Sequence, residues 1–185
     1  MNMHLSEFVW QKNMVDEDEY NFVEPYMSDL SKFATSQPGW MKGPVATDPE
    51  ECPIPKDHDL ATKTFDMISD SINFFMIETK SMPWQYDNLV SRDYIWKQYT
   101  KDEDYTYTHI DTDTKETYNR MVAWVLFLND VEEGGEFEFE YSGLKVKPEK
   151  GKVLMFPCNY LFPYRVNTPK SNDLTIMTGY IYNNF

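Results

Sequence analysis

Apolar side chains recur at helical spacing over residues 60–79. Phe65, Ile68, Ile72 and Phe75 form one continuous stripe there. Positions three, four and seven apart share one face of a helix. The pattern therefore predicts an amphipathic helix whose apolar stripe packs against a sheet.

A second helical pattern precedes it. Phe22, Tyr26 and Leu30 recur at helical spacing, and the acidic run 16–19 suits a first helical turn because a helix N-terminus carries partial positive charge. Pro25 is expected to kink or restart this helix. Residues 37–59 are predicted to be a loop because they hold five prolines, namely Pro38, Pro44, Pro49, Pro53 and Pro55.

From about residue 93 the pattern becomes that of β-strands. Residues 137–141 alternate apolar and acidic side chains, as a half-buried strand does, whereas 121–128 are apolar on both faces, which is typical of a central strand. Residues 8–12 add a possible outer strand. The eight main candidates are 94–99, 105–111, 121–128, 135–141, 144–146, 152–156, 164–167 and 174–182.

These elements predict an α+β, mainly β chain. Its core is expected to be a jelly roll or small barrel of about eight strands braced by N-terminal helices. A chain of 185 residues fits one domain. We expect supporting helices and a loop over residues 1–85 and the β core over residues 86–185.

The charge of the chain narrows the classes of partner. A formal net charge of -14 repels phosphate groups, so neither nucleic acid nor an anionic membrane is expected as the primary partner. A small-molecule or peptide substrate remains, with a weak preference for basic or neutral groups. The sequence does not indicate the oligomeric state.

Cysteine usage and hydropathy indicate the compartment. Cys52 and Cys158 form neither a disulfide framework nor a metal-binding motif. No signal peptide is recognisable, and no apolar run approaches the roughly 18–20 residues that span a bilayer. The expected localisation is cytoplasmic.

Candidate chemistry lies in residues 105–111, which read Tyr-Thr-Tyr-Thr-His-Ile-Asp. On a strand, residues i and i+2 point to the same face, so the side chains of His109 and Asp111 should converge. An imidazole and a carboxylate suit divalent iron, manganese or zinc, and they form two thirds of the iron-binding facial triad. This pair is the predicted metal site.

Two further blocks accompany this segment. Residues 119–139 contain Leu-Asn-Asp followed by Glu-Glu-Gly-Gly, and residues 146–157 contain Lys-Pro-Glu-Lys-Gly and end in Phe-Pro. In this order the three blocks resemble the iron(II)- and 2-oxoglutarate-dependent oxygenases, specifically the prolyl-4-hydroxylase-like branch. The resemblance covers roughly residues 94–182, and the N-terminal helices look like the supporting helices of that branch.

The resemblance implies a double-stranded β-helix that binds Fe(II) and 2-oxoglutarate. His109 and Asp111 match the first two metal ligands. The second histidine of the family falls where Tyr164 stands, so Tyr164 is carried over as a candidate catalytic residue. The basic residue that pairs with the distal carboxylate of 2-oxoglutarate falls near Leu174. The chain departs from the family at both positions.

Several residues are candidates to replace the missing basic group. Tyr105 or Tyr107 could donate a hydrogen bond to a co-substrate carboxylate. Arg165 follows Tyr164 directly, but neighbouring strand residues face opposite sides. The candidates carried forward for cofactor binding are Tyr105, Arg120 and Arg165, with Lys152 and Lys170 as further possibilities.

Three functions remain open. The first is a dioxygenase of the hydroxylase type with an altered metal and co-substrate site. The alternative is a catalytically inactive binding or structural protein with the oxygenase fold. The changes at Tyr164 and Leu174 would both follow if such a protein had lost the co-substrate site. A metal-dependent jelly roll with other chemistry, such as a cupin-like isomerase, has no additional ligand cluster to support it.

Overall fold

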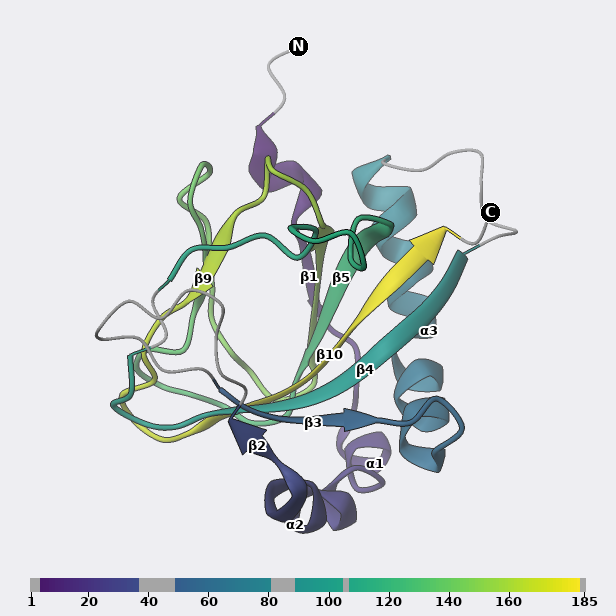
Figure 1. Ribbon diagram of the computed structural model, residues 1–185, viewed down its shortest axis with the longest axis vertical. Helices are drawn as coiled ribbons and strands as arrows, with labels where there is room; N and C mark the ends of the chain where they lie inside the picture. Colours follow the sequence, from purple (N-terminus) through teal and green to yellow (C-terminus); the bar gives the residue numbers. More distant parts are fainter. Residues whose placement is uncertain (1–3, 37–48, 81–88, 105–106, 184–185) are drawn as a thin grey trace.

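The computed structural model describes residues 4–36, 49–80, 89–104 and 107–183. Its strands form a seven-stranded sheet, in the order β1-β8-β5-β10-β4-β3-β2, and a three-stranded sheet, in the order β7-β6-β9. All pairings are antiparallel. Figure 1 shows the two sheets with helix α3 on the far side of the larger one. The expected jelly-roll class is confirmed.

The strand bounds follow the hydrophobic pattern closely. The larger sheet is built from β1 (Trp10–Asn13), β2 (Thr35–Ser36), β3 (Glu50–Ile54), β4 (Leu89–Tyr99), β5 (Arg120–Phe127), β8 (Lys152–Pro157) and β10 (Leu174–Asn183). The smaller sheet is built from β6 (Phe137–Phe139), β7 (Lys145–Val146) and β9 (Tyr164–Val166). Seven of the eight main strand candidates therefore correspond to observed strands.

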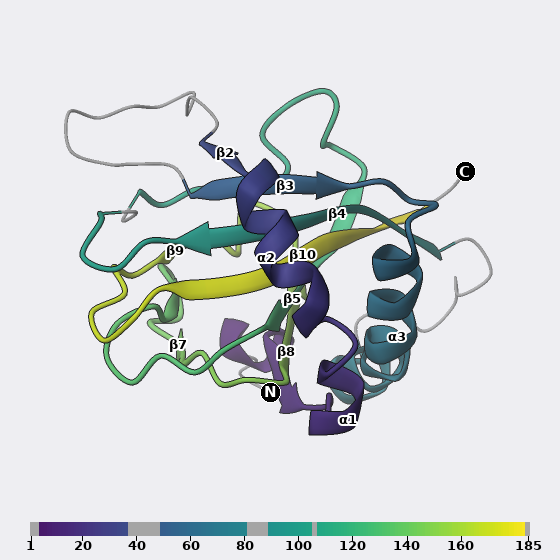
Figure 2. The same cartoon turned by 90° about the horizontal axis from the view of Figure 1, so that it is seen from below.

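The N-terminal helices begin where the sequence predicts. After the short 3-10 helix η1 (Leu5–Phe8) and β1, helix α1 (Glu17–Tyr20) is capped by Asp16, whose side chain accepts a 2.9 Å hydrogen bond from the Glu19 amide. Helix α2 (Glu24–Phe33) starts afresh with Pro25 in its first turn. Figure 2 shows α1 and α2 from below.

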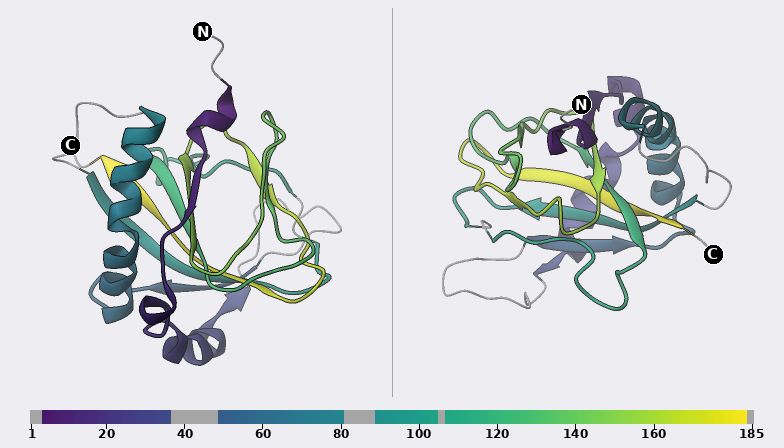
Figure 3. Two further views of the ribbon diagram at one scale, coloured as in Figure 1. Left: turned by 180° about the vertical axis from the view of Figure 1, so that it is seen from behind. Right: turned by 90° about the horizontal axis from the view of Figure 1, so that it is seen from above.

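Helix α3 (Asp59–Thr79) braces the larger sheet. The His58 side chain accepts a 3.1 Å hydrogen bond from the Leu60 amide and so caps the helix. Ile68 and Phe75 of the predicted stripe are buried against the sheet. Figure 3 shows the helix running along the face that points away from the smaller sheet. The apolar interior is therefore divided into a helix–sheet layer and a layer between the two sheets.

The predicted loop over residues 37–59 is partly wrong. Residues 37–48 lie outside the described part of the chain, but β3 occupies residues 50–54 and pairs with β4. β2 pairs with only Glu50 and Glu51, so within the described residues no strand covers the edge of β3 at Pro53. Proline is tolerated at such an edge because its missing amide donor is not needed there.

The predicted strand over residues 105–111 is also wrong. Residues 105 and 106, and with them the candidate Tyr105, lie outside the described residues. His109 forms an isolated bridge with Tyr164 at the free edge of β9, and its neighbours do not continue the ladder.

None of the helices in the described ranges combines the length and the apolar character that crossing a bilayer requires.

Candidate functional site

His109 and Asp111 lie side by side between the two sheets. His109 Nε2 is 4.0 Å from Asp111 Oδ1, and the backbone of His109 exchanges two hydrogen bonds of 3.0 Å with Tyr164. The bridge thus fixes this segment against β9. The side chain of Asp111 is only 8% exposed and that of His109 is 30% exposed.

The carboxylate of Asp111 has unequal surroundings at its two oxygens. Oδ1 accepts hydrogen bonds from the hydroxyls of Tyr164, at 3.3 Å, and Tyr180, at 3.2 Å. Oδ2 is buried, and no hydrogen-bond partner for it exists among the described residues. A buried carboxylate oxygen without a partner is costly. A cation is the group that would relieve this cost.

Tyr164 fills the space beside this pair. Its ring stacks on Phe137 with centroids 5.6 Å apart, meets Phe156 edge-on at 4.9 Å, and lies 4.5 Å from the His109 ring. Burial, and then the charge of Asp111, raise the pKa of the Tyr164 phenol well above its ordinary value. The phenol therefore keeps its proton and donates a hydrogen bond.

The imidazole of His109 is held in the neutral form. Burial lowers its pKa below the ordinary value, which outweighs the opposing effect of Asp111, and Lys97 lowers it further. A neutral imidazole offers one ring nitrogen as an acceptor, which is the state that binds a metal.

Arg120, at the start of β5, connects the site to β4 and β10. Its Nη1 donates to the backbone oxygen of Asp111 at 3.3 Å, its Nε donates to the Tyr182 hydroxyl at 3.0 Å, and its guanidinium lies 3.7 Å from the centre of the Tyr180 ring. Its Nη2 is 3.1 Å from Asp93 Oδ2. Arg120 therefore supports the backbone of Asp111 directly, and it also packs on Tyr180, whose hydroxyl donates a hydrogen bond to Asp111.

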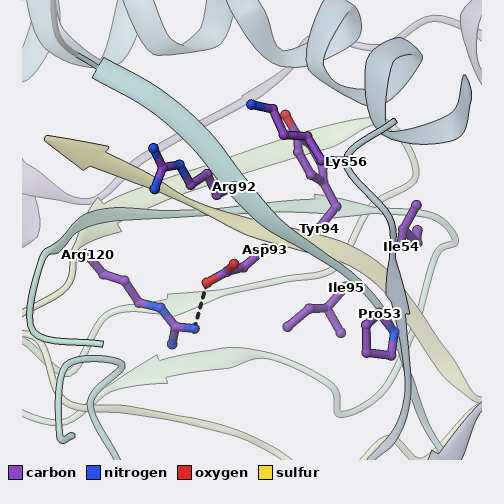
Figure 4. A pocket seen from close by; sticks show the side chains of 8 residues that line it. All are labelled: Pro53, Ile54, Lys56, Arg92, Asp93, Tyr94, Ile95 and Arg120. Atoms are coloured by element: carbon purple, nitrogen blue, oxygen red, sulfur yellow. Dashed lines mark hydrogen bonds and ion pairs between the residues drawn. The ribbon is translucent and has the colours of Figure 1, made fainter. Parts of the chain in front are cut away.

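Asp93 owes its position to an irregularity in β4. It has φ of +56°, the left-handed region, and lies where the pairing of β4 with β10 shifts register. Such a conformation in a non-glycine residue re-aims the side chain. Figure 4 shows Asp93 pointing to Arg120. Both residues line a cavity of about 400 Å³, together with residues that include Lys56, Arg92 and Ile95.

The remaining candidate cations are engaged elsewhere. Arg165 is 3.0 Å from Glu138, on the face of β9 opposite Tyr164. Lys152 is 2.7 Å from Glu149, and Lys170 is 3.2 Å from Asp102. Of the sequence candidates for a co-substrate cation, the structure brings only Arg120 to the His109–Asp111 pair.

Two residues at the site were not predicted from the sequence. Tyr180 contacts Asp111 directly, and Lys97 of β4 faces the same interior, where Glu51 lies 2.7 Å from its Nζ. Lys97 lies in the same alternating phase as buried Tyr99. A lysine two residues before a tyrosine on the inward-facing side of a strand is the sequence signal that could have identified Lys97.

The donor set fits a metal ion in part. Within the described ranges, no group of three or more His, Cys, Asp and Glu side chains is placed to hold a metal. His109 and Asp111 nevertheless supply two donors of the kind that iron(II) uses, and the unpartnered Oδ2 suits a cation. At the other end of the site, Leu174 is fully buried and offers no charge to a carboxylate.

Comparisons with known proteins point in the same direction. A family model described as the 2OG-Fe(II) oxygenase superfamily matches residues 95–182. No curated protein matches the chain in sequence.

Solved structures share the fold at low sequence identity. The viral collagen prolyl hydroxylase of Paramecium Bursaria Chlorella virus-1, solved with 2OG, is 18% identical with a TM-score of 0.67, and the alignment covers 96% of this chain and 97% of that one. A Pseudomonas putida prolyl-4-hydroxylase is 15% identical with a TM-score of 0.69, over 97% and 95% of the two chains. A Trichoplax adhaerens prolyl hydroxylase bound to a hypoxia inducible factor peptide is 13% identical with a TM-score of 0.69, over 96% and 84%.

Proposed function

We propose that this chain is an iron(II)- and 2-oxoglutarate-dependent dioxygenase of the hydroxylase type with an altered site, and that it belongs to the 2OG-Fe(II) oxygenase superfamily, whose family model matches residues 95–182. One observation carries this proposal. The buried Oδ2 of Asp111 has no hydrogen-bond partner among the described residues, and Oδ1 of the same carboxylate lies 4.0 Å from Nε2 of the neutral imidazole of His109.

The physical argument concerns charge. A carboxylate taken out of water without full compensation costs several kcal/mol, and this chain already carries a net charge of -14. A divalent cation held by His109 and Asp111 would remove that cost. Tyr164 keeps its proton and is therefore a hydrogen-bond donor to Asp111 rather than a third ligand. Water is left to complete the coordination.

Each neighbouring residue has a role in this proposal. When bound, iron(II) with 2-oxoglutarate and O₂ supplies the chemistry that hydroxylates a C–H bond. Tyr180 orients the Asp111 carboxylate, and Arg120 holds the Asp111 backbone. The rings of Phe137 and Phe156 exclude water from one side of the site. The cavity beside Arg120 is the proposed place for the substrate.

Metal-dependent stabilisation tests this proposal. Thermal unfolding would be measured with and without Mn(II), which replaces iron without turnover. A metal at about 100 times its dissociation constant stabilises the native state by about 2.7 kcal/mol, so the melting temperature should rise. The rise should disappear in Asp111→Asn and His109→Ala but persist in Asp113→Asn, a matched change at an exposed position. No rise in the unmodified protein would contradict the proposal.

Turnover is tested separately. The chain with Fe(II), 2-oxoglutarate and O₂ should release succinate, and the structural neighbours named as prolyl hydroxylases make a prolyl peptide the first substrate to try.

A catalytically inactive binding protein is the second candidate. It is favoured by the hydroxyls of Tyr164 and Tyr180, which already satisfy Asp111 Oδ1 without a metal, and by the buried, uncharged Leu174. In that case only the double variant Tyr164→His/Leu174→Arg should bind 2-oxoglutarate in calorimetry. Tight binding by the unmodified protein with metal would eliminate this candidate.

A further inference from the structure

The co-substrate has a carboxylate at each end, and its distal carboxylate needs a cation. The resemblance places a basic residue near Leu174, at the start of β10. Leu174 is fully buried in the apolar layer between the sheets. The expected position therefore cannot neutralise the charge, and a carboxylate buried there without a partner would be strongly disfavoured.

The neighbouring strand carries a cation close to this position. In the antiparallel pair of β10 and β4, Leu174 lies opposite Tyr99 and Ile176 lies opposite Lys97. Tyr99, Leu174 and Ile176 belong to the layer between the sheets. Because strand residues alternate, Lys97 shares that inner face. It is displaced from the level of Leu174 by two residues, or about 7 Å along the strand.

We propose that Lys97 binds the distal carboxylate of 2-oxoglutarate in this chain, in place of the basic residue expected near Leu174. This inference rests on the proposed function, because it presupposes a metal and a co-substrate between the sheets.

Arg120 is the other cation at the site, and its position excludes it from this role. It lies opposite Tyr182, eight residues from Leu174 on β10, which corresponds to about 27 Å along the strand. Its guanidinium is engaged by Asp93, by Tyr182 and by the Asp111 backbone. Arg120 therefore belongs to the metal end of the site, whereas Lys97 lies near the opposite end.

Lys97 is charged and partly shielded from water. Burial lowers its pKa, but Glu51 outweighs this effect, with help from Asp111 and Tyr107, so the pKa lies above its ordinary value. These influences also place the ammonium within electrostatic reach of the Asp111 segment. The side chains of Lys97 and Glu51 are 18% and 21% exposed.

The ammonium can accept a further partner. Within the described part of the chain its ionic partner is Glu51, at 2.7 Å, and an ammonium has three donors. A carboxylate of the co-substrate can therefore join or displace Glu51. The like charge of Glu51 opposes this binding, so Glu51 should weaken the affinity for 2-oxoglutarate.

Calorimetric titration of 2-oxoglutarate into the Mn(II)-loaded protein tests the assignment. Lys97→Met alone would leave Glu51 unpaired and could unfold the chain, so the comparison is made in a Glu51→Gln background. Glu51→Gln should bind 2-oxoglutarate more tightly than the unmodified protein. Glu51→Gln/Lys97→Met should bind at least about 100-fold more weakly than Glu51→Gln, since removal of one partner from a buried charge pair has effects of this size.

Two controls make the result specific. Glu51→Gln/Lys97→Arg keeps the charge and should stay within about 10-fold of Glu51→Gln. Lys145→Met removes a lysine that pairs with Glu138 in the smaller sheet and should leave binding unchanged.

The outcomes separate the two proposals. Equal affinity in Glu51→Gln and Glu51→Gln/Lys97→Met would overturn the assignment of Lys97. A Mn(II)-dependent rise in melting temperature without any 2-oxoglutarate binding in the unmodified protein and in Glu51→Gln would overturn both the assignment of Lys97 and the 2-oxoglutarate-dependent activity, and would leave only the metal site. Absence of the Mn(II)-dependent rise would overturn the proposed function itself, and the role of Lys97 with it.

Discussion

Tyr164 stands where the resemblance places a second histidine. Its ring lies among Phe137, Phe156 and His109, and its hydroxyl reaches Asp111 Oδ1. A phenol with a raised pKa can donate a hydrogen bond but is a poor ligand for a divalent ion. If His109 and Asp111 bind a metal as proposed, the difference between tyrosine and histidine at this one position should decide how tightly the metal is held.

Replacing this residue tests that statement. Tyr164→His should raise the affinity for Mn(II) by at least about 10-fold, because even the loss of a group that merely supports a metal ligand changes affinity by about 10–100-fold. Affinity would be measured by calorimetry. Tyr164→Phe, which also removes the hydroxyl but adds no donor, is the control and should show no such gain. An unchanged affinity in Tyr164→His would mean that position 164 does not face the metal.

The convergence of His109 and Asp111 could be predicted from sequence, because i and i+2 spacing brings two side chains together in any extended segment. Lys97 and Tyr180 could not be placed in the same way. Their proximity to the site depends on which residues of β4 and β10 face each other, and that register involves a bulge at Asp93. Register is set by packing across the sheets rather than by local pattern.

Among the elements, β6 carries a side chain that forms ion pairs with both neighbouring strands of the smaller sheet. Glu138 lies 3.2 Å from Lys145 of β7 and 3.0 Å from Arg165 of β9. Burial raises the pKa of Glu138, but Arg165, Asn167 and Lys145 outweigh it, so the pKa lies below its ordinary value. The two ion pairs of this carboxylate, which add to the backbone pairing of the three strands, therefore exist only while Glu138 is ionised.

Protonation of Glu138 in acid should therefore lower the free energy of unfolding of the chain. A depressed folded-state pKa contributes stability that is present above the unfolded value, about 4.3 for glutamate, and is lost as pH falls through the folded value. Urea unfolding between about pH 5 and pH 3 should show a shallower loss of stability for Glu138→Gln than for the unmodified protein. Glu7→Gln, at an exposed helical position, is the control. Parallel curves for Glu138→Gln and the unmodified protein would contradict the prediction.

Most strands could be predicted because their apolar residues alternate or run continuously. β3 was missed because Pro53 and Pro55 made residues 37–59 resemble a loop. Its position next to β4 depends on a pairing partner about forty residues further along the chain, and local patterns carry no information about such a partner.

At the scale of the whole molecule, the two apolar layers make different contributions to the structure. One layer joins α3 to the larger sheet, and the other lies between the sheets and contains Tyr164 and Tyr180. Damage to the helix layer should therefore lower overall stability without a change in the metal donors.

Ile68 offers a direct test because it is fully buried on the side of α3 that packs against the larger sheet. Ile68→Ala should reduce the free energy of unfolding by about 2–5 kcal/mol, as measured by urea denaturation. Ile77→Ala, on the same helix but 68% exposed, should change it by no more than about 0.5 kcal/mol. Mn(II) affinity should be the same in both variants. A weaker metal affinity in Ile68→Ala alone would show that the two layers are coupled.

The jelly-roll layout could be predicted because the three sequence blocks occur in a characteristic order. The sequence locates the two positions at which the chain departs from the resemblance, Tyr164 and Leu174, but it does not locate the cation that we propose in their place. Lys97 and Arg120 reach the interior from β4 and β5, on opposite sides of β10, and only the folded sheet brings them to one site.

The bridge between His109 and Tyr164 has an evolutionary consequence. Two backbone hydrogen bonds of 3.0 Å hold position 164 opposite His109, and neither depends on the side chain at position 164. The place of that side chain beside His109 and Asp111 is thus set by the backbone. Every tyrosine codon becomes a histidine codon through a single base change. This chain therefore lies one base change from a set of three candidate metal ligands, at positions that the backbone already holds together.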